Sequence, residues 1–260
     1  MPRLPDETLA LMGAAAAAPA SRRLRKPTPK SGGYSSATDP YADLGWETVP
    51  VDGKVIRVKG ATGRQGTVTD DKRHEWASDP RHQDANIAIR HNGTIAIDVD
   101  EHDDKHGAAT LAAFEAEFGP RTPTWTSTAR HATSPESRQY HYRIEPGTVL
   151  ISSAENVEFC QFHHRYSVVA PSIHPVTGEP YLWFDPDGNR SDRPPHVEEL
   201  PFLDAAWVDG LRVDRGAQRE AATPGGNSTG GVFKGMSLPD LRKHAPQRHE
   251  GRTNDWLAVV

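Results

Sequence analysis

Cysteine is nearly absent from this sequence, because Cys160 is the only one among 260 residues. A single thiol excludes a disulfide framework and any zinc site made of four cysteines. No run of about 18 apolar residues is present either, which is the length that a membrane-spanning helix needs. We therefore expect no membrane partner and a cytoplasmic protein. Basic residues do not outnumber acidic ones either, since the formal net charge is −5. A net acidic chain argues against a general nucleic-acid coat protein.

Apolar side chains are sparse as well, at 35% of the chain, while glycine and proline supply 22 residues each. Globular domains typically reach roughly 45–50% with glycine counted, so part of the chain is not expected to pack. Residues 1–38 are rich in Ala, Pro, Ser and Arg and are predicted to be a disordered basic tail. Residues 39–204 hold nearly all the aromatic and β-branched residues and are predicted to be the main domain. Residues 205–238 resemble a flexible linker, and 239–260 resemble the start of a further helical domain.

The main domain is predicted to have an α+β fold with a mixed or antiparallel sheet. Thr69 is a candidate N-cap for a short helix that runs through Ala77. Residues 107–118 show the spacing of an amphipathic helix that ends at Gly119. Two apolar runs around His91-Asn92-Gly93 predict a β-hairpin of 86–90 with 94–100. Further short strands are expected at 123–128, 139–144, 156–160 and 166–170, followed by a hairpin around 177–178.

The strand at 94–100 carries the first candidate site. Side chains alternate between the two faces of a strand, so Ile95, Ile97 and Val99 point one way while Asp98 and Asp100 point the other. Carboxylates at positions i and i+2 have Cα atoms roughly 6–7 Å apart, which suits a shared divalent ion. An Asp-x-Asp pair is common, however, and a solvated strand end explains it equally well.

Two later strands repeat this alternation. In 139–144 the face opposite the tyrosines carries His141 and Arg143, and in 156–160 the face opposite Val157 and Phe159 carries Glu158. Three strands would then present carboxylates for metal and a cationic corner for phosphate, which is the equipment of metal-assisted phosphoryl transfer. His141 taken alone fits a buried structural histidine as well.

A set of motifs in fixed order gives a resemblance to a known family. The order of these motifs resembles the bifunctional primase–polymerase (prim-pol) branch of the archaeo-eukaryotic primase superfamily, over about residues 42–185. That resemblance implies a catalytic core with RRM-like elements, flanked by an N-terminal α/β module. The matching segments are VKGAT (58–62), GTIAIDVD (93–100), TWTST (124–128), YHYR (140–143), YSVVAPSIH (166–174) and GEPYLW (178–183).

The resemblance also implies roles for individual residues. Asp98, Asp100 and Glu158 match the catalytic carboxylates that bind two divalent ions, Mg²⁺ or Mn²⁺, although the family usually has aspartate at the third position. His141 matches a histidine that contacts the phosphates of the incoming nucleotide. The chain departs from the family where Arg138 and its neighbours replace a Gly-Gly pair. Further residues implied in nucleotide binding are Arg130, Arg143, Ser172 and His174.

The implied activity is that of a DNA primase and DNA polymerase. Its partners would be a single-stranded DNA template, a primer, and dNTPs or rNTPs. The resemblance also implies a phage or plasmid replication protein with a helicase portion beyond residue 260. Two alternatives stay open: a catalytically inactive module that binds single-stranded DNA, and an Asp-x-Asp nucleotide-sugar transferase, which would leave His141 and Glu158 without a role.

Zinc is the remaining cofactor to consider. Cys160, His163, His164 and His174 are residue types that bind zinc. Their spacing is not that of a recognised zinc finger. We therefore do not expect a zinc site.

Overall fold

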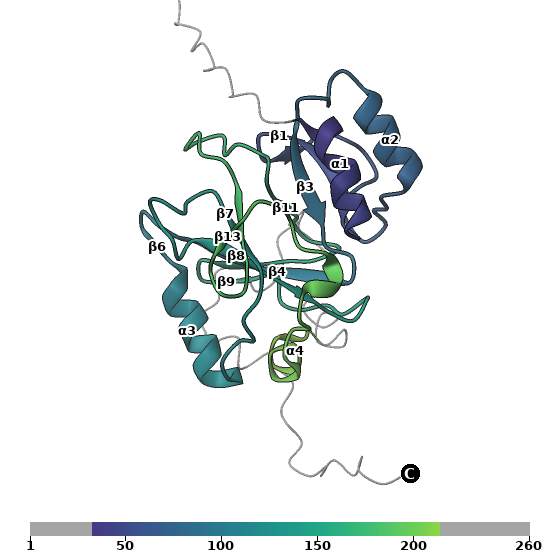
Figure 1. Cartoon of the computed structure of the whole chain (residues 1–260). Helices are drawn as coiled ribbons and strands as arrows, with labels where there is room; N and C mark the ends of the chain where they lie inside the picture. Colours follow the sequence, from purple (N-terminus) through teal and green to yellow (C-terminus); the bar gives the residue numbers. More distant parts are fainter. Residues whose placement is uncertain (1–32, 214–260) are drawn as a thin grey trace, which may run out of the picture.

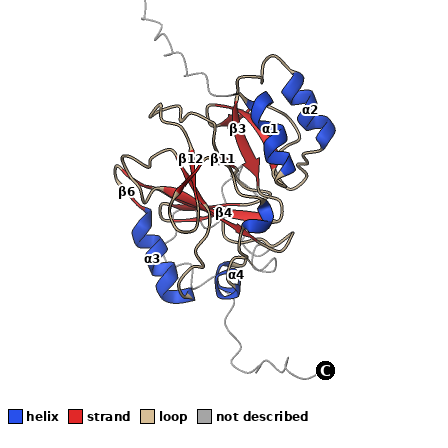
Figure 2. Ribbon diagram, viewed as in Figure 1, coloured by secondary structure: helices blue, strands red, loops and turns tan. Residues whose placement is uncertain are grey.

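The computed structural model describes residues 33–213, which form two antiparallel sheets and a short two-stranded ribbon. Helices α1 and α2 pack beside the smaller sheet, and α3 and α4 lie against the larger one (Figure 1). Strands and helices are intermixed along the chain, and loops connect most of them (Figure 2). The predicted α+β class with antiparallel pairing is confirmed, while the RRM-like arrangement stays a prediction. None of the helices within 33–213 is long and apolar enough to cross a membrane.

The smaller sheet has the strand order β11-β3-β1-β2, with every neighbouring pair antiparallel. All five residues of β3 are buried, as expected for a central strand. Helix α2 begins after Thr69, whose side chain accepts a hydrogen bond from the Lys72 N–H, so the predicted N-cap is confirmed. The elements are α1 (Tyr34–Asp43), β1 (Glu47–Asp52), β2 (Val55–Ile56), α2 (Asp70–Ser78), β3 (Asn86–Arg90) and β11 (Ser167–Val168).

The larger sheet has the order β13-β12-β7-β8-β4-β10-β9, so β4 lies between β8 and β10. The helix predicted at 107–118 is confirmed as α3. The elements are β4 (Thr94–Val99), the ribbon of β5 (Glu101–His102) and β6 (Lys105–His106), α3 (Gly107–Phe118), β7 (Thr126–Thr128), β8 (Arg138–Arg143), β9 (Ser153–Ala154), β10 (Val157–Cys160), β12 (Leu182–Phe184), β13 (Arg190–Ser191), the 3₁₀ turn η1 (Val197–Glu199) and α4 (Ala205–Leu211).

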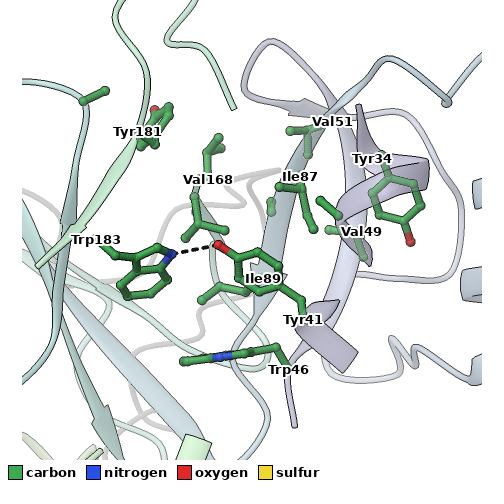
Figure 3. Packing of buried hydrophobic residues seen from close by; sticks show 14 of the residues in the cluster. Tyr34, Tyr41, Trp46, Val49, Val51, Ile87, Ile89, Val168, Tyr181 and Trp183 are labelled. Carbon is green, nitrogen blue, oxygen red and sulfur yellow. Dashed lines mark hydrogen bonds between the residues drawn. The ribbon is translucent and has the colours of Figure 1, made fainter. Parts of the chain in front are cut away.

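Two hydrophobic cores hold these layers together. The first lies between the larger sheet and helices α3 and α4, where Phe114 and Trp207 pack under the apolar side of β4. The second joins the smaller sheet to α1 and to the opposite side of the larger sheet. In this second core the Trp183 indole donates a hydrogen bond of 2.7 Å to the Tyr41 hydroxyl (Figure 3). Tyr41 in turn donates to the Ala170 carbonyl at 2.6 Å, so one tyrosine of α1 ties the two sheets together.

The hairpin predicted for 86–90 with 94–100 is wrong. Strands β3 and β4 do not pair with each other, because β3 belongs to the smaller sheet and β4 to the larger one. The turn signal at Gly93 is real, since that residue has φ +71°, but it carries the chain from one sheet to the next. Buried His91 fixes this crossing by hydrogen bonds to Thr94 at 3.1 Å and to Ser167 at 2.8 Å. The turn expected at 177–178 is present, where the Gly178 N–H donates to the His174 carbonyl.

Two predicted domain boundaries need correction. Residues 34–38 were assigned to the disordered tail, yet they begin α1, and Tyr34 is completely buried in the second core. Residues 205–211 were assigned to the linker, yet they form α4, and Trp207 is completely buried against α3. Single aromatic residues provide this packing, and composition averaged over a window does not reveal them. The predictions for 1–32, for the rest of the linker and for 239–260 lie outside the described residues.

Candidate active site

The alternation predicted for β4 is confirmed by burial. Ile95, Ile97 and Val99 are buried in the core beneath α3, while Asp98 and Asp100 are only partly buried on the other side of the sheet. Both carboxylates line a pocket on that side. The sequence therefore placed the two acids correctly relative to the core.

Asp98 lies at the centre of a three-strand row of polar side chains. Its register partners are Gln139 on β8 and Glu158 on β10. The Gln139 amide donates a hydrogen bond of 3.1 Å to Asp98 Oδ2. Burial raises the pKa of Asp98 to about 6, the negative charge of Asp100 adds to this shift, and the hydrogen bond from Gln139 opposes it. Asp98 is therefore protonated more easily than an exposed aspartate.

The other two carboxylates have cationic partners. Lys105 Nζ forms an ion pair with Asp100, and His102 Nε2 lies 3.5 Å from the same carboxylate. Arg165 lies 3.0 Å from Glu158. Glu158 is therefore beside Asp98 in the sheet, yet its side chain is held by an arginine and does not line the pocket.

Positive charge from separate segments faces the aspartates across the pocket. Arg130 comes from the loop between β7 and β8, and Arg138 is the first residue of β8. Lys54 comes from the turn between β1 and β2 of the smaller sheet. Lys54 interacts electrostatically with both Asp98 and Asp100. The site thus has acidic side chains on its β4 side and basic side chains around it, which suits a metal-bound polyphosphate.

His174 lines the same pocket and has a defined tautomer. Its Nδ1 accepts hydrogen bonds from the backbone N–H groups of Val176 at 3.3 Å and Thr177 at 3.2 Å. Burial lowers the pKa of His174 to about 4, and the positive charges of Lys54 and Arg130 lower it further. The ring is therefore neutral and carries its proton on Nε2.

His141 is placed behind the pocket. Its side chain is completely buried between the two sheets, and its ring centroid lies 4.7 Å from that of Trp183. His141 Nε2 lies 2.9 Å from the Ser127 hydroxyl, which lies 3.4 Å from Gln139 Oε1. Since Gln139 bonds Asp98, His141 is connected to the carboxylates by a chain of hydrogen bonds. Burial, together with the neighbouring His91, lowers its pKa well below the ordinary value.

Two further residues from the sequence prediction lie away from the pocket. The Ser172 hydroxyl is completely buried, accepts from the Ile87 N–H at 2.9 Å and donates to the Ile87 carbonyl at 3.0 Å. Arg143 pairs in register with Thr94, at the opposite end of β4 from Asp98. Its guanidinium donates to the Leu200 carbonyl at 2.8 Å and lies over the Phe202 ring. Of the predicted nucleotide-binding residues, Arg130 and His174 are the two that line the pocket.

The pocket residues suit a hard divalent cation. No group of three or more His, Cys, Asp or Glu side chains within 33–213 is positioned to hold a metal on its own. Mg²⁺, however, is commonly bound by one or two carboxylates, with waters and substrate phosphates completing the shell. Asp98 and Asp100 provide two such carboxylates, and the raised pKa of Asp98 indicates charge that a cation would neutralise. Cys160, in contrast, is buried as a free thiol.

Several pocket residues were not identified from the sequence. Gln139 was on the correct strand face but received no role, although it holds Asp98. Lys54 gave no sequence signal, because it follows Gly53 in an ordinary turn and approaches β4 only after the two sheets pack. His102 and Tyr181 also line the pocket.

Comparisons with known proteins address the family of the chain. No curated protein matches this sequence. The family model described as "Bifunctional DNA primase/polymerase, N-terminal" matches residues 38–201, which is more than half of the chain. That segment includes both sheets and every carboxylate of the row around Asp98. The chain therefore belongs to the bifunctional DNA primase/polymerase N-terminal domain family.

Proposed function

We propose that this protein is a nucleotidyltransferase that synthesises primers and extends them on a single-stranded DNA template. Family membership supports a DNA primase/polymerase type of function. The observation that carries the finer proposal is the pair Asp98 and Asp100, which faces a pocket edged by Lys54, Arg130 and Arg138. Carboxylates opposite a cationic rim suit a nucleoside triphosphate that is bound with divalent metal.

The carboxylates would hold Mg²⁺ or Mn²⁺. Asp98 and Asp100 already face the pocket, and Glu158 would join them once its side chain leaves Arg165. When bound, two such ions lower the pKa of an attacking 3′-hydroxyl and stabilise a leaving pyrophosphate. Gln139 orients Asp98 through its 3.1 Å hydrogen bond to Oδ2.

The rim residues would bind and orient the triphosphate. Arg130 and Lys54 supply fixed positive charge, and the neutral His174 ring offers its Nε2–H as a donor to a phosphate oxygen. Since positioning and charge neutralisation provide most of the acceleration in phosphoryl transfer, no nucleophile from the protein is required. Ser127 and His141 would act behind this layer by holding Gln139 in place.

The cellular setting belongs to the proposal as well. The acceptor would be a primer on single-stranded DNA, and the donor a dNTP or an rNTP. The proposed setting is replication of a phage or plasmid in the cytoplasm, where a helicase portion of the same protein would supply the single strand. The family description supports the replication chemistry of this proposal.

The direct test is primer extension. The full chain is incubated with a primed single-stranded template, dNTPs and Mg²⁺ or Mn²⁺, and the products are resolved by length. A parallel reaction without a primer, containing rNTPs and dNTPs, tests synthesis of new primers. Elongation that requires both template and divalent metal supports the proposal, and its absence with either metal contradicts it.

The ion pairs of the site favour a second candidate, a module that binds single-stranded DNA without catalysis. Lys105 forms an ion pair with Asp100 and Arg165 with Glu158, so two of the three carboxylates are already neutralised by side chains of the protein. Template binding without elongation in the same assay would select this candidate. The nucleotide-sugar transferase considered from the sequence has no support in the family match.

A further inference from the structure

A second pocket lies beside the candidate active site, and we call it the Phe162 pocket. One wall is formed by the apolar residues Val55 and Ile56 of β2. Another part of the lining is a tight turn, in which Gln161 and His164 exchange backbone hydrogen bonds of 2.7 and 2.9 Å. Side chains that face the pocket from this turn and its surroundings include Arg90, Phe162, His163, Arg165 and Tyr166.

The charged side chains that line this pocket are basic. None of the described residues that line it is an aspartate or a glutamate. Arg64 follows the lining residue Gly63, and its positive charge helps lower the pKa of His163 to about 4, after the larger effect of burial. In a chain of net charge −5, a concave surface lined by two arginines and no acid is suited to an anion.

Unsatisfied polar atoms also point to a missing ligand. Within 33–213, four buried side-chain nitrogen atoms have no hydrogen-bond partner: Nε of Arg73, Nε of Arg90, Nδ1 of His141 and Nδ1 of His163. Two of these atoms, in Arg90 and His163, belong to residues that line the Phe162 pocket. Arg90 is only 8% exposed and is held by Glu47 at 2.7 Å, so its guanidinium is fixed in position. Buried polar atoms normally have partners, so this clustering indicates a site that is completed by a bound molecule.

Aromatic rings beside cations identify the class of ligand. Proteins that bind single-stranded nucleic acid stack bases on aromatic rings and track the backbone with Arg and Lys. Phe162 is half-buried, Val55 is 49% exposed, and Arg165 is 49% exposed, so an apolar surface lies next to an accessible guanidinium. A base between Phe162 and Val55, with its phosphate on Arg165, would use both surfaces.

Two contacts connect this pocket to the candidate active site. The Tyr166 hydroxyl donates a hydrogen bond of 2.6 Å to the carbonyl of Lys54, whose side chain lines the catalytic pocket. Arg165 lies 3.0 Å from Glu158, the register partner of Asp98. Arg165 also has φ +66°, a left-handed backbone conformation that is uncommon for arginine. The turn thus holds the guanidinium between a carboxylate of the active site and the open pocket.

We propose that the Phe162 pocket binds a segment of single-stranded DNA, and that its phosphate draws Arg165 away from Glu158. The freed carboxylate would then turn toward Asp98 and complete the metal site. Binding of the strand and binding of the metal would therefore favour each other, by a coupling that is reciprocal. The DNA-binding part stands by itself, whereas the release of Glu158 rests on the proposed function.

The first experiment measures DNA binding without catalysis. The full chain is titrated against a fluorescent oligothymidylate in EDTA, and anisotropy is recorded at several salt concentrations. Phe162→Ala should weaken binding at least about fivefold through lost stacking. Arg165→Gln should weaken it about tenfold and reduce the salt dependence by about one phosphate contact. Wild-type affinity in both variants would overturn the proposal.

Matched controls use exposed residues outside the pocket. Arg57 is 59% exposed and pairs with Asp52, close to the same strand β2, and Phe202 is 50% exposed beside Arg143. Arg57→Gln and Phe202→Ala should each bind the oligonucleotide within about twofold of wild type. Losses in these controls equal to those in the pocket variants would show non-specific binding and would also overturn the proposal.

A competition arm separates a DNA strand from a free nucleotide. Both carry a base and a phosphate, so dTTP and unlabelled oligothymidylate are compared as competitors in EDTA. The proposal predicts displacement by the oligonucleotide at far lower concentration than by dTTP. Equal displacement per nucleotide would assign the pocket to a free nucleotide and contradict its assignment to a strand.

A metal-binding arm tests the coupling through Glu158. Free Mn²⁺ is measured by electron paramagnetic resonance, with and without the oligonucleotide. In wild type the oligonucleotide should tighten Mn²⁺ binding roughly two- to fivefold, the worth of an exposed ion pair. Arg165→Gln should bind Mn²⁺ more tightly from the start, and Glu158→Gln should show no coupling. Equal Mn²⁺ affinity in wild type with and without the strand would overturn the coupling.

Failure of this proposal is distinguishable from failure of the proposed function. Wild-type protein that extends a primer, while Phe162→Ala and Arg165→Gln bind DNA normally, would overturn the pocket and keep the polymerase. Protein that binds DNA through the pocket but never extends a primer would keep the pocket and overturn the polymerase.

Discussion

The imidazole rings of His91 and His141 are stacked between the two sheets, with centroids 6.0 Å apart. His91 follows β3 of the smaller sheet and His141 lies on β8 of the larger one, so the pair marks the contact between the sheets. Both side chains are completely buried. Two protonated rings at this separation would repel each other in a poorly solvated interior, and both are therefore neutral.

This pair predicts acid sensitivity of the fold. Burial lowers the pKa of His91 to about 3, with a further contribution from Arg90, and burial also lowers the pKa of His141. In the unfolded chain these histidines become protonated near pH 6.5, whereas in the folded protein they stay neutral to a much lower pH. The free energy of unfolding is therefore highest above pH 6.5 and falls as the pH decreases toward 3. Each histidine should contribute a slope of about 1.4 kcal/mol per pH unit. Urea unfolding across this range measures the slope.

The matched variants for this measurement are His91→Gln and His106→Gln. The first removes a buried titrating ring and should reduce the slope of stability against pH. The second removes a ring that is 73% exposed and should leave the slope unchanged. Equal slopes in wild type and His91→Gln would contradict the assignment.

The second prediction concerns His141 itself. His141→Ala should lower the free energy of unfolding by about 2–4 kcal/mol, because it leaves a cavity beside Trp183 and removes the partner of Ser127. Chemical denaturation measures this loss, and nucleotide titration on the same variant measures affinity. A variant with wild-type stability and lost dNTP binding would instead support the direct phosphate contact that the family resemblance implies.

His141 also illustrates what the sequence could and could not predict. Strand alternation predicted which faces of β4, β8 and β10 are apolar, because that pattern is local and has a period of two residues. It could not tell whether the opposite face of the sheet meets solvent or another sheet. His141 and Asp98 share that face, yet the smaller sheet covers one and leaves the other in a pocket.

The sequence also could not predict which strands pair with each other. The turn at Gly93 is encoded locally, but the partner of β3 is decided by contacts with β1 and β11, which lie far away along the chain. The same applies to Lys54, which reaches the aspartates only through packing of the two sheets. Such long-range arrangements leave no local pattern for a sequence to display.

The third prediction concerns the metal site. Asp98→Asn and Asp100→Asn should each lower primer extension at least about 100-fold, since an amide is a much poorer ligand for Mg²⁺ than a carboxylate. Without metal, Asp98→Asn should be as stable as wild type or more so, because it removes a charge that burial and Asp100 disfavour. Asp104→Asn, at an exposed residue in the turn between β5 and β6, is the control and should retain activity. Full activity in either site variant would contradict the assignment.

The fourth prediction concerns Ser172. Ser172→Ala removes the acceptor of the Ile87 N–H and leaves the Ile87 carbonyl with only its hydrogen bond from the Val169 N–H. Stability should therefore fall by about 1–3 kcal/mol. The KM for dNTPs should stay unchanged, because the hydroxyl is buried away from the pocket. Thermal unfolding and primer-extension kinetics on one preparation measure both quantities. A raised KM at unchanged stability would show that Ser172 contacts the nucleotide.

The last prediction concerns the boundaries of the folded unit. A fragment of residues 33–213 should fold cooperatively, whereas a fragment of residues 39–204 should not. The shorter fragment lacks Tyr34 and Trp207, which are both completely buried, one in each core. Loss of one large buried aromatic side chain costs about 3–5 kcal/mol, and a typical domain has only about 5–15 kcal/mol in total. Urea unfolding followed by tryptophan fluorescence and by circular dichroism compares the fragments. Equal midpoints for both would show that the first half of α1 and all of α4 are dispensable, and would restore the narrower limits that composition alone predicts.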